Sequence, residues 1–346
     1  MLSGSEASLF RVAERFLTSL GMTWLENFPF STSAPRFPFS GWLMPGPKFV
    51  NVITMKKIRK AVVPAAGWGT RTLPASKAIP KEMITVVDRP SIQWMIEEAV
   101  EAGIEQLIFI TGKGKGAIKD HFSFNPELDR ALRSKGKDKL ADELKALASM
   151  VEIVTVRQRE PLGLGHAIGC ARKIVGNEPF AVMLPDDLFD CKPPAIKQLM
   201  DVAAEFDAPA VALLYVPDEM VSLYGMVHYE KVRERVYRIW DMVEKPPIGK
   251  SPSNWSIIGR YVFPPEIFDI IAATSPGHGG EIQITDAIST LADKMTVLGV
   301  DFIGVRNDIG NFPGYIRAFL HYAMKNPDYA RVVRKFVKEK KDEFTG

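Results

Sequence analysis

The sequence predicts an α/β fold built on a doubly wound, mostly parallel sheet, with a smaller mixed β part and a C-terminal helix. Continuous apolar runs recur at residues 61–64, 107–110 and 180–184, and segments with helical periodicity separate them. A glycine-rich or Pro-Asp turn follows each run. Runs that are apolar throughout indicate strands buried on both faces, as in parallel sheets flanked by helices.

The first half of the domain alternates strands with helices. The strand over residues 61–64 leads into a glycine turn, and residues 91–102 form a helix whose apolar side chains share one face. A second strand covers residues 107–110. The charge-laced stretch 128–148 is expected to be a helix with a solvated face, and residues 151–156 form the next strand.

The second half contains more strand signals. The expected elements are, in order, a short helix over 165–173, strands over 180–184 and 210–216, a β-ribbon over 227–243, a strand at 261–263, a helix after residue 282, a strand near 302–305 and a basic C-terminal helix. The alternating pattern of the ribbon is typical of antiparallel strands, so we expect a smaller mixed β part here.

Composition excludes several classes of protein. The chain has 346 residues, a net charge of +3 and two cysteines, Cys170 and Cys191. This charge is too small to favour nucleic-acid binding, and no apolar run approaches the roughly 20 residues of a membrane span. We expect both cysteines to be reduced thiols in a cytoplasmic protein, with no disulfide scaffold and no membrane partner.

Residues 1–54 differ from the rest of the chain, being rich in Phe, Pro, Ser and Trp. A helical period runs over residues 7–20, but the basic start, apolar core and cleavage site of a signal peptide are missing. Met55 precedes a basic stretch and a strand, as a natural start would. We expect a poorly ordered leader over 1–54, either a non-native upstream stretch or a genuine extension, and a domain over 55–346.

The strongest motif is a glycine loop that follows the first strand, Ala65-Ala66-Gly67-Trp68-Gly69-Thr70-Arg71. Glycines let the backbone approach a phosphate, and consecutive N–H groups can surround its oxygens. Arg71 can fork onto two phosphate oxygens. The dinucleotide fingerprint fails because residue 72 is Thr, and no P-loop pattern is present. A tight strand-to-helix turn without a ligand is the structural alternative.

Two lysines, Lys77 and Lys81, lie close behind Arg71. This concentration of positive charge suits a triphosphate from which pyrophosphate must leave. Surface lysines are usually only solvated, so neither lysine would carry this prediction alone.

An ordered series of motifs resembles the sugar-phosphate nucleotidyltransferases. The glycine loop, Leu73-Pro74, Lys77 and Pro80-Lys81-Glu82 are similar to the signature of that family. The later matches are, in order, Asp120-His121-Phe122, Arg157-Gln158, Gly163-Leu164-Gly165-His166-Ala167, Leu184-Pro185-Asp186, Tyr224-Gly225, Val243-Glu244-Lys245-Pro246, Ile258-Gly259-Arg260-Tyr261, Gly279-Gly280-Glu281-Ile282-Gln283, Thr285-Asp286 and Asp308-Ile309-Gly310-Asn311. The resemblance covers residues 55–324 and implies a Rossmann-like nucleotidyltransferase fold for the domain.

The resemblance also implies a reaction. The segment Ile79-Pro80-Lys81-Glu82-Met83 is similar to bacterial family members that use UTP and glucose 1-phosphate. An oxygen of the sugar 1-phosphate would attack the α-phosphorus of UTP in line, and UDP-glucose and pyrophosphate would form with the help of Mg²⁺. Positioning and charge neutralisation should supply most of the rate. The catalytic residues implied are Arg71, Lys81, Asp186 and Lys245.

Two aspartates are candidates for the metal site. Asp186 stands just past the carboxyl end of an apolar strand, where open α/β sheets place ligand-binding groups. It matches the metal aspartate of the family, and Asp308 matches a second one in related thymidylyltransferases. Mg²⁺ usually takes one or two carboxylates and keeps water and phosphate as its other ligands. For Asp186-Asp187, a helix N-cap or a turn is the structural alternative.

The base and the phosphates have their own candidate residues. Uracil presents an N–H flanked by two carbonyls, so Glu82 can accept from it, and Gln158 can donate to a carbonyl. The resemblance implies that these two residues read the base together with backbone groups near Ala66 and Gly163. The nucleotide-binding set is therefore Ala65, Ala66, Gly67, Gly69, Thr70, Glu82, Gln158 and Gly163. An exposed strand position is the structural alternative for Gln158.

The sugar phosphate has a second group of candidates. Lys245 can pair with the phosphate of the incoming sugar, and Glu244 can accept from sugar hydroxyls. Gly225 and Gly259 would let the backbone approach the sugar ring. Asp187 is a further acceptor for a sugar hydroxyl. An edge turn is the structural alternative for the Glu-Lys-Pro segment.

Other functions remain open at this point. The same chemistry could use dTTP or another hexose 1-phosphate, since one methyl group alters binding by only about 1–3 kcal/mol. A non-catalytic nucleotide-binding regulator of the same fold is a second alternative, and a nicotinamide dehydrogenase is disfavoured by the glycine pattern. The C-terminal helix indicates a subunit contact, so we expect a homo-oligomer, a dimer or a tetramer.

Overall fold

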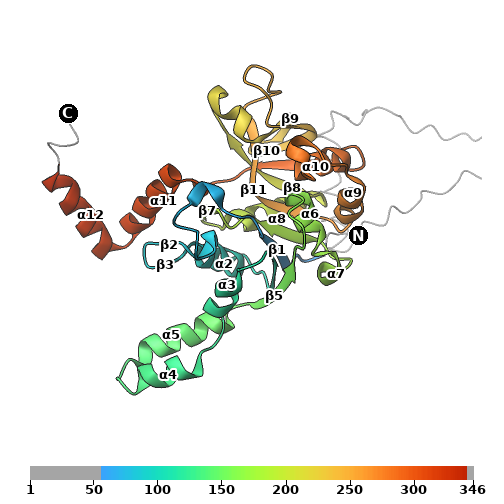
Figure 1. The fold of residues 1–346 in the computed structure, drawn as a ribbon. Helices are drawn as coiled ribbons and strands as arrows, with labels where there is room; N and C mark the ends of the chain where they lie inside the picture. The colour runs from blue at the N-terminus through green and yellow to red at the C-terminus, as the bar shows by residue number, and fades with distance from the viewer. Residues whose placement is uncertain (1–55, 341–346) are drawn as a thin grey trace, which may run out of the picture. The chain divides into compact units, whose positions relative to one another are not determined.

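One mixed sheet runs through residues 56–340, the part of the chain that the computed structural model describes (Figure 1). Its strands are β1 (Lys60–Ala65), β4 (Gln106–Thr111), β5 (Glu152–Arg157), β6 (Phe180–Met183), β8 (Ala210–Tyr215), β9 (Gly225–Arg233), β10 (Val236–Glu244), β11 (Trp255–Phe263) and β12 (Val297–Asp301). Their order across the sheet is β5-β4-β1-β6-β11-β8-β12-β10-β9.

The sheet is mixed rather than mostly parallel. The neighbours β5, β4, β1 and β6 are parallel, whereas β11 is antiparallel to β6 and β8, and β10 is antiparallel to β12 and β9. The strands of the second half also join this same sheet, so the smaller mixed β part expected from the sequence is a region of one sheet. A continuous apolar run does not reveal whether a strand is parallel or antiparallel to its neighbours. β11 is buried over nearly its whole length, as parallel strands are, although it is antiparallel to both β6 and β8.

Two short ladders complete the strands. One pairs β2 (Thr85–Val86) with β3 (Arg89–Pro90), and the other pairs β7 (Asp187–Asp190) with β13 (Val305–Asp308) in antiparallel fashion. In the second ladder Asp308 lies opposite Asp187. The strand expected near residues 302–305 is therefore two strands, β12 and β13, with residues 302–304 between them.

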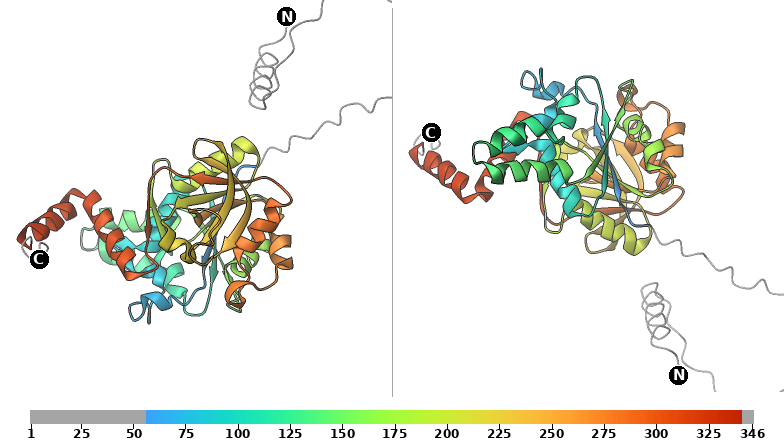
Figure 2. Two further views of the ribbon diagram at one scale, coloured as in Figure 1. Left: turned by 90° about the horizontal axis from the view of Figure 1, so that it is seen from above. Right: turned by 90° about the horizontal axis from the view of Figure 1, so that it is seen from below.

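Helices cover both faces of the sheet (Figures 1 and 2). The helices of the described residues are α2 (Ser91–Glu101), α3 (Gly116–His121), α4 (Pro126–Arg133), α5 (Asp138–Ser149), α6 (Leu164–Gly169), α7 (Arg172–Val175), α8 (Ala195–Phe206), α9 (Ile267–Ala273), α10 (Ile284–Ala292), α11 (Phe312–Lys325) and α12 (Pro327–Glu339), of which α2 and α8 pack on one face and α6, α9 and α10 on the other. The helix expected over 128–148 is a hairpin of α4 and α5, because Gly136 adopts a positive φ between them. The described residues end in two helices, since Asn326 caps a new helix with Pro327 at its first position.

Successive side chains of the central strands belong to two different hydrophobic cores, one on each face of the sheet. On β1, Ala61 and Val63 belong to the cluster that packs under α2 and α8, whereas Val62 belongs to the cluster that packs under α6, α9 and α10. Successive side chains of a strand point to opposite faces, so one buried strand supplies both cores. This double burial explains the continuous apolar runs in the sequence.

Three expectations concern features outside the sheet. The leader over residues 1–54, including its helical period, lies outside the described residues. Across residues 56–340, no helix combines the length and the apolarity needed to cross a membrane. Cys170 and Cys191 are both free thiols.

Candidate active site

A hollow of about 380 Å³ opens beside the carboxyl ends of β1 and β6. Its lining includes residues that the sequence analysis singled out: Ala66, Gly67, Gly69, Thr70, Lys81, Gln158, Gly163 and Asp186. They come from separate stretches that follow β1, β5 and β6, which run in the same direction. The carboxyl ends of parallel strands meet at one edge of a sheet, and the predicted residues converge there.

The glycine loop is fixed by its own hydrogen bonds. Ala65 is the buried last residue of β1, and Gly69 adopts a left-handed conformation with a φ of 66°. The Gly69 carbonyl accepts from the backbone N–H of Thr72 at 3.0 Å and from the Thr72 hydroxyl at 2.8 Å. Ser76 donates to the same carbonyl at 3.1 Å. These bonds fix the shape of the loop, and Arg71 is exposed beside it.

Lys81 and Asp186 form an ion pair at the wall of the hollow. The Lys81 Nζ lies 2.6 Å from the Asp186 Oδ2. Desolvation lowers the pKa of Lys81, but Asp186 and Glu82 outweigh it, so the pKa lies above the ordinary lysine value. Desolvation raises the pKa of Asp186, but Lys81 outweighs it and lowers the pKa. Both groups are therefore charged near neutral pH.

An arginine that the sequence analysis missed neutralises the neighbouring acids. The Arg306 Nε donates to the Asp187 Oδ1 at 2.8 Å, and its Nη2 lies 3.7 Å from the Asp308 Oδ2. The Arg306 Nη1 donates to the Tyr224 hydroxyl at 3.3 Å. Desolvation alone would lower the pKa of Arg306, but the acids around it raise it above the ordinary value. Its position two residues before Asp308 on one strand was the available signal, because such residues face the same side.

The two candidate metal carboxylates lie beside one small space. A Cβ added to Gly310 would lie 3.0 Å from the Asp308 Oδ1 and 3.7 Å from the Asp186 Oδ2. The Gly310 N–H donates to Asp308 at 2.8 Å, and the Ile309 N–H donates to the Asp186 carbonyl at 2.9 Å. Among residues 56–340, no group of three His, Cys, Asp or Glu side chains is placed to hold a metal. Two carboxylate donors fit Mg²⁺, which completes its shell with water and phosphate.

Glu82 lies in a buried ion pair and does not line the hollow. Only 1% of its side chain is exposed, and its Oε2 accepts from the Lys115 Nζ at 2.7 Å. Its Oε1 is buried and has no hydrogen-bond partner within the described residues. One oxygen of Glu82 is thus without a partner among the described residues, while the other oxygen connects the glycine-lysine loop after β4 to the turn that carries Lys81.

Replacing Glu82 by Gln is expected to lower the free energy of unfolding by about 3 kcal/mol, because it leaves the Lys115 charge buried and unpaired. Urea unfolding of the purified variant measures the change. The double variant Glu82→Gln/Lys115→Met should regain much of the loss, since neither charge then remains. A single variant as stable as the native chain would contradict this structural role.

Gln158 and Gly163 meet at the opposite wall. The Gln158 Nε2 donates to the Gly163 carbonyl at 3.3 Å and lies 2.9 Å from the His166 Nδ1. The amide nitrogen is therefore occupied within the protein, which leaves the Gln158 Oε1 as an acceptor. Gly163 has a φ of 101°, and a Cβ there would lie 2.7 Å from the Cβ of Glu281. Only glycine fits this position.

The residues expected to hold the sugar form two groups. In one, Gly259 donates its N–H to the Asp187 Oδ2 at 3.1 Å, and a Cβ on Gly259 would lie 2.5 Å from that oxygen. Both oxygens of Asp187 are therefore engaged, by Arg306 and by Gly259. Desolvation raises the pKa of Asp187 above its ordinary value despite the nearby arginine.

The other group lies at the end of the β9–β10 ribbon, where Glu244 pairs with Gly225. The Glu244 Oε1 lies 2.9 Å from the Lys245 Nζ, and its Oε2 accepts from the Thr285 hydroxyl at 3.1 Å. A Cβ on Gly225 would overlap the Thr285 methyl group. Tyr224 connects the two groups, because its carbonyl accepts from the Lys245 N–H at 3.0 Å while its hydroxyl bonds Arg306.

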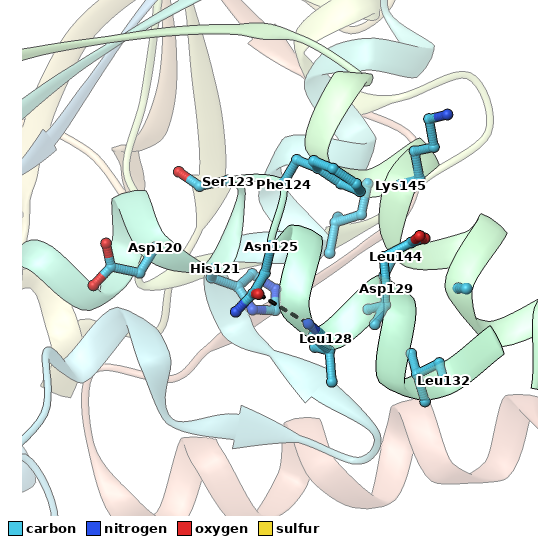
Figure 3. Close-up of a pocket in the computed structure, with 12 residues that line it drawn as sticks. Asp120, His121, Ser123, Phe124, Asn125, Leu128, Asp129, Leu132, Leu144 and Lys145 are labelled. Atoms are coloured by element: carbon cyan, nitrogen blue, oxygen red, sulfur yellow. Dashed lines mark hydrogen bonds between the residues drawn. The ribbon is translucent and has the colours of Figure 1, made fainter. Parts of the chain in front are cut away.

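A second hollow lies apart from these residues. It has a volume of about 210 Å³ and lies between α3, α4 and α5, with Phe124, Leu128 and Leu144 among its lining (Figure 3). Asn125 caps α4 at its edge by accepting from the backbone N–H of Leu128 at 3.0 Å. None of the site residues singled out in the sequence lines this groove.

Comparison with known proteins gives consistent matches. The family model described as "Nucleotidyl transferase" matches residues 60–325. A UTP–glucose-1-phosphate uridylyltransferase of Bacillus subtilis is 48% identical over 274 residues, which is 79% of this chain and 94% of that protein. The protein of the same name from Staphylococcus haemolyticus is 46% identical over 285 residues, covering 82% of this chain and 99% of that one.

Solved structures agree with these relatives. A UTP-bound UDP-glucose pyrophosphorylase (UGPase) from Acinetobacter baumannii is 41% identical with a TM-score of 0.76, covering 82% of this chain and 99% of that one. A UDP-glucose pyrophosphorylase complexed with UDP-glucose is also 41% identical, with a TM-score of 0.72 over 78% of this chain and 100% of that one.

Proposed function

The chain belongs to the nucleotidyl transferase family, and on that premise we propose that it makes UDP-glucose and pyrophosphate from UTP and glucose 1-phosphate. The Lys81–Asp186 pair beside the glycine loop carries this proposal. A cation and a carboxylate beside one hollow next to the glycine loop are what transfer from a triphosphate needs. The relatives named for this activity are 45–48% identical to the chain.

The glycine loop and the cations after it bind the triphosphate in this proposal. Backbone N–H groups near Gly67 and Gly69 surround phosphate oxygens, and Arg71 and Lys81 neutralise their charge. An oxygen of glucose 1-phosphate forms a bond to the α-phosphorus while the bond from that phosphorus to the bridging oxygen breaks. The electron pair of the broken bond leaves with pyrophosphate.

Asp186 and Asp308 would hold the divalent cation, and we propose that it is Mg²⁺. When bound, such a cation neutralises phosphate charge and favours the departure of pyrophosphate. The Lys81 ammonium also pairs with one oxygen of Asp186. In this proposal the Lys81 ammonium also pairs with a phosphate oxygen of the triphosphate.

Selectivity is assigned to the two walls of the site. The Gln158 side chain and the backbone at Ala66 and Gly163 contact the base, with Glu82 as the acceptor of the base N–H. Lys245 binds the phosphate of the sugar, and Glu244 and Asp187 accept from its hydroxyls, with Gly225 and Gly259 beside the ring. The finer parts of this proposal are the preference for uracil over thymine and the preference for glucose over another hexose.

A pyrophosphate-release assay over a panel of nucleotides and sugar 1-phosphates tests the proposal. UTP with glucose 1-phosphate and Mg²⁺ should give the highest kcat/KM, with a preference over dTTP of about tenfold or more. Removing the metal with a chelator should stop release. Release that is fastest with dTTP would move the assignment to a thymidylyltransferase, and no release with any pair would favour a nucleotide-binding regulator.

We also propose that the chain forms a homo-oligomer through α11 and α12. Apolar side chains stay exposed along both helices: Ile316, Phe319, Leu320, Met324, Val332, Phe336 and Val337. In Figures 1 and 2, α12 lies away from the sheet, beyond α11. Exposed apolar side chains in such number on two neighbouring helices are typical of a subunit contact. The domain over 55–346 contains every residue proposed for the site, so the leader over 1–54 is proposed to be dispensable for the chemistry.

A further inference from the structure

A buried arginine lies directly behind the catalytic aspartate. Arg260 on β11 has no exposed surface and is among the largest fully buried side chains of the described residues. Its Nη1 donates to the carbonyls of Leu184 at 3.0 Å and Gly259 at 2.8 Å. Its Nη2 donates to the carbonyl of Asp187 at 3.0 Å. One guanidinium therefore binds three carbonyls next to the site.

Two of these hydrogen bonds hold the two ends of a single turn of the chain. Leu184 and Asp187 are the two ends of the segment that leaves β6, and Asp186 lies between them. A planar fork that bonds both ends fixes the distance between them and the orientation of the segment. The backbone adds one bond to the same clamp, since the Leu184 N–H donates to the Gly259 carbonyl at 2.9 Å.

The charge of Arg260 is balanced by Glu98 on α2. Its Nη2 lies 2.6 Å from the Glu98 Oε2, and its Nε lies 3.1 Å from the Oε1. The guanidinium also stacks 4.4 Å from the ring centroid of Phe189. The same helix α2 begins at Ser91, whose hydroxyl donates to the Glu82 carbonyl at 2.9 Å, next to Lys81. One rigid helix thus connects the lysine and the aspartate of the reactive pair.

We propose that Arg260 is a positioning residue for phosphoryl transfer: through the carbonyls of Leu184 and Asp187 it orients the Asp186 carboxylate, with Glu98 as its counter-ion. This inference rests on the proposed function. Apolar groups can replace a buried ion pair without loss of stability, so stability alone does not require a guanidinium here. The three carbonyl acceptors need donors in a fixed plane, and a lysine ammonium cannot bond them together with Glu98 in the same geometry.

The test compares Arg260→Lys with Arg89→Lys in the full chain. Arg89 is a matched control, because it stacks 4.5 Å from the Trp94 ring and bonds Glu97 on the same helix α2, but bonds no carbonyl of the site. We expect Arg260→Lys to lower kcat about 100-fold, as a small misplacement of reacting groups does. The KM for UTP should change by less than about threefold, because the triphosphate site is intact. Arg89→Lys should keep the native kcat.

Thermal unfolding and kcat, measured well below each midpoint, separate positioning from stability. A lower unfolding midpoint with native kcat in Arg260→Lys would overturn the proposal, as would an equal loss of kcat in Arg89→Lys. If Arg260→Lys does not fold, Glu98→Gln replaces it: this variant removes the carboxylate charge that holds the Nε and Nη2 groups of Arg260 in place. It should lower kcat at an unchanged KM, and native kcat would overturn the proposal. Failure of the proposed function would differ, because the native chain itself would then release no pyrophosphate.

Discussion

Replacing Asp186 by Asn is expected to lower kcat about 1000-fold. Removal of one electrostatic group at a reacting centre typically lowers kcat by about 100- to 1000-fold. The amide has the shape of the carboxylate but no charge, so it can neither hold a divalent cation well nor keep the Lys81 ammonium paired. The side chain is partly exposed, which limits the cost to folding. Pyrophosphate release at saturating substrates measures kcat, and thermal unfolding checks that the fold is intact.

Asp190→Asn provides the matched control for this experiment. Asp190 lies on β7 close to Asp186 in sequence and is also ion-paired with a lysine, Lys325, while His321 donates to it at 2.8 Å. It contacts none of the residues proposed for catalysis, so its variant should keep native kcat. Asp186→Asn with more than about a tenth of native activity would contradict the metal and catalytic roles given to this aspartate.

Replacing Gly314 by Ala is expected to lower the free energy of unfolding by about 2–3 kcal/mol. A Cβ at this position would overlap the backbone carbonyl oxygen of Asp308, which cannot rotate away. Either α11 or the end of β13 must shift, and a shift of Asp308 should also raise the metal concentration needed for half-maximal activity. Urea unfolding measures the first effect, and a Mg²⁺ titration of pyrophosphate release measures the second.

Gly116→Ala tests whether this loss comes from the close contact. Gly116 is the first residue of α3 and has open space where a Cβ would lie. Alanine is favoured over glycine in a helix by up to about 1 kcal/mol, so this variant should be neutral or stabilising. If Gly314→Ala were equally neutral, the close packing of α11 against Asp308 would be refuted.

The sequence predicted the parts of the site that depend on short-range pattern. The glycine loop was recognisable because phosphate contact needs glycines directly after a strand, and Asp186 because acids at strand ends face the ligand edge. The roles given to these residues stay predictions. The structure adds that they converge on one hollow with Lys81 and Gln158.

The parts that sequence reasoning missed depend on long-range pairing. Arg260 pairs with Glu98, which is 162 residues away in the sequence, and Lys115 pairs with Glu82, which is 33 residues away. Nothing in the local pattern of a strand or loop says which distant carboxylate a buried cation will meet. The direction of β11 was missed for a related reason, because burial on both faces gives the same apolar run in parallel and antiparallel strands.

Insertions and deletions should be unequally tolerated along this chain. Residues two apart on a strand face the same side, and in the β7–β13 ladder this brings both Arg306 and Asp308 to the acidic end of β7. One residue added ahead of them within β13 would turn both side chains to the opposite face. The α4–α5 turn around Gly136 has open space instead, so length variation within the family can accumulate there without reaching the chemistry.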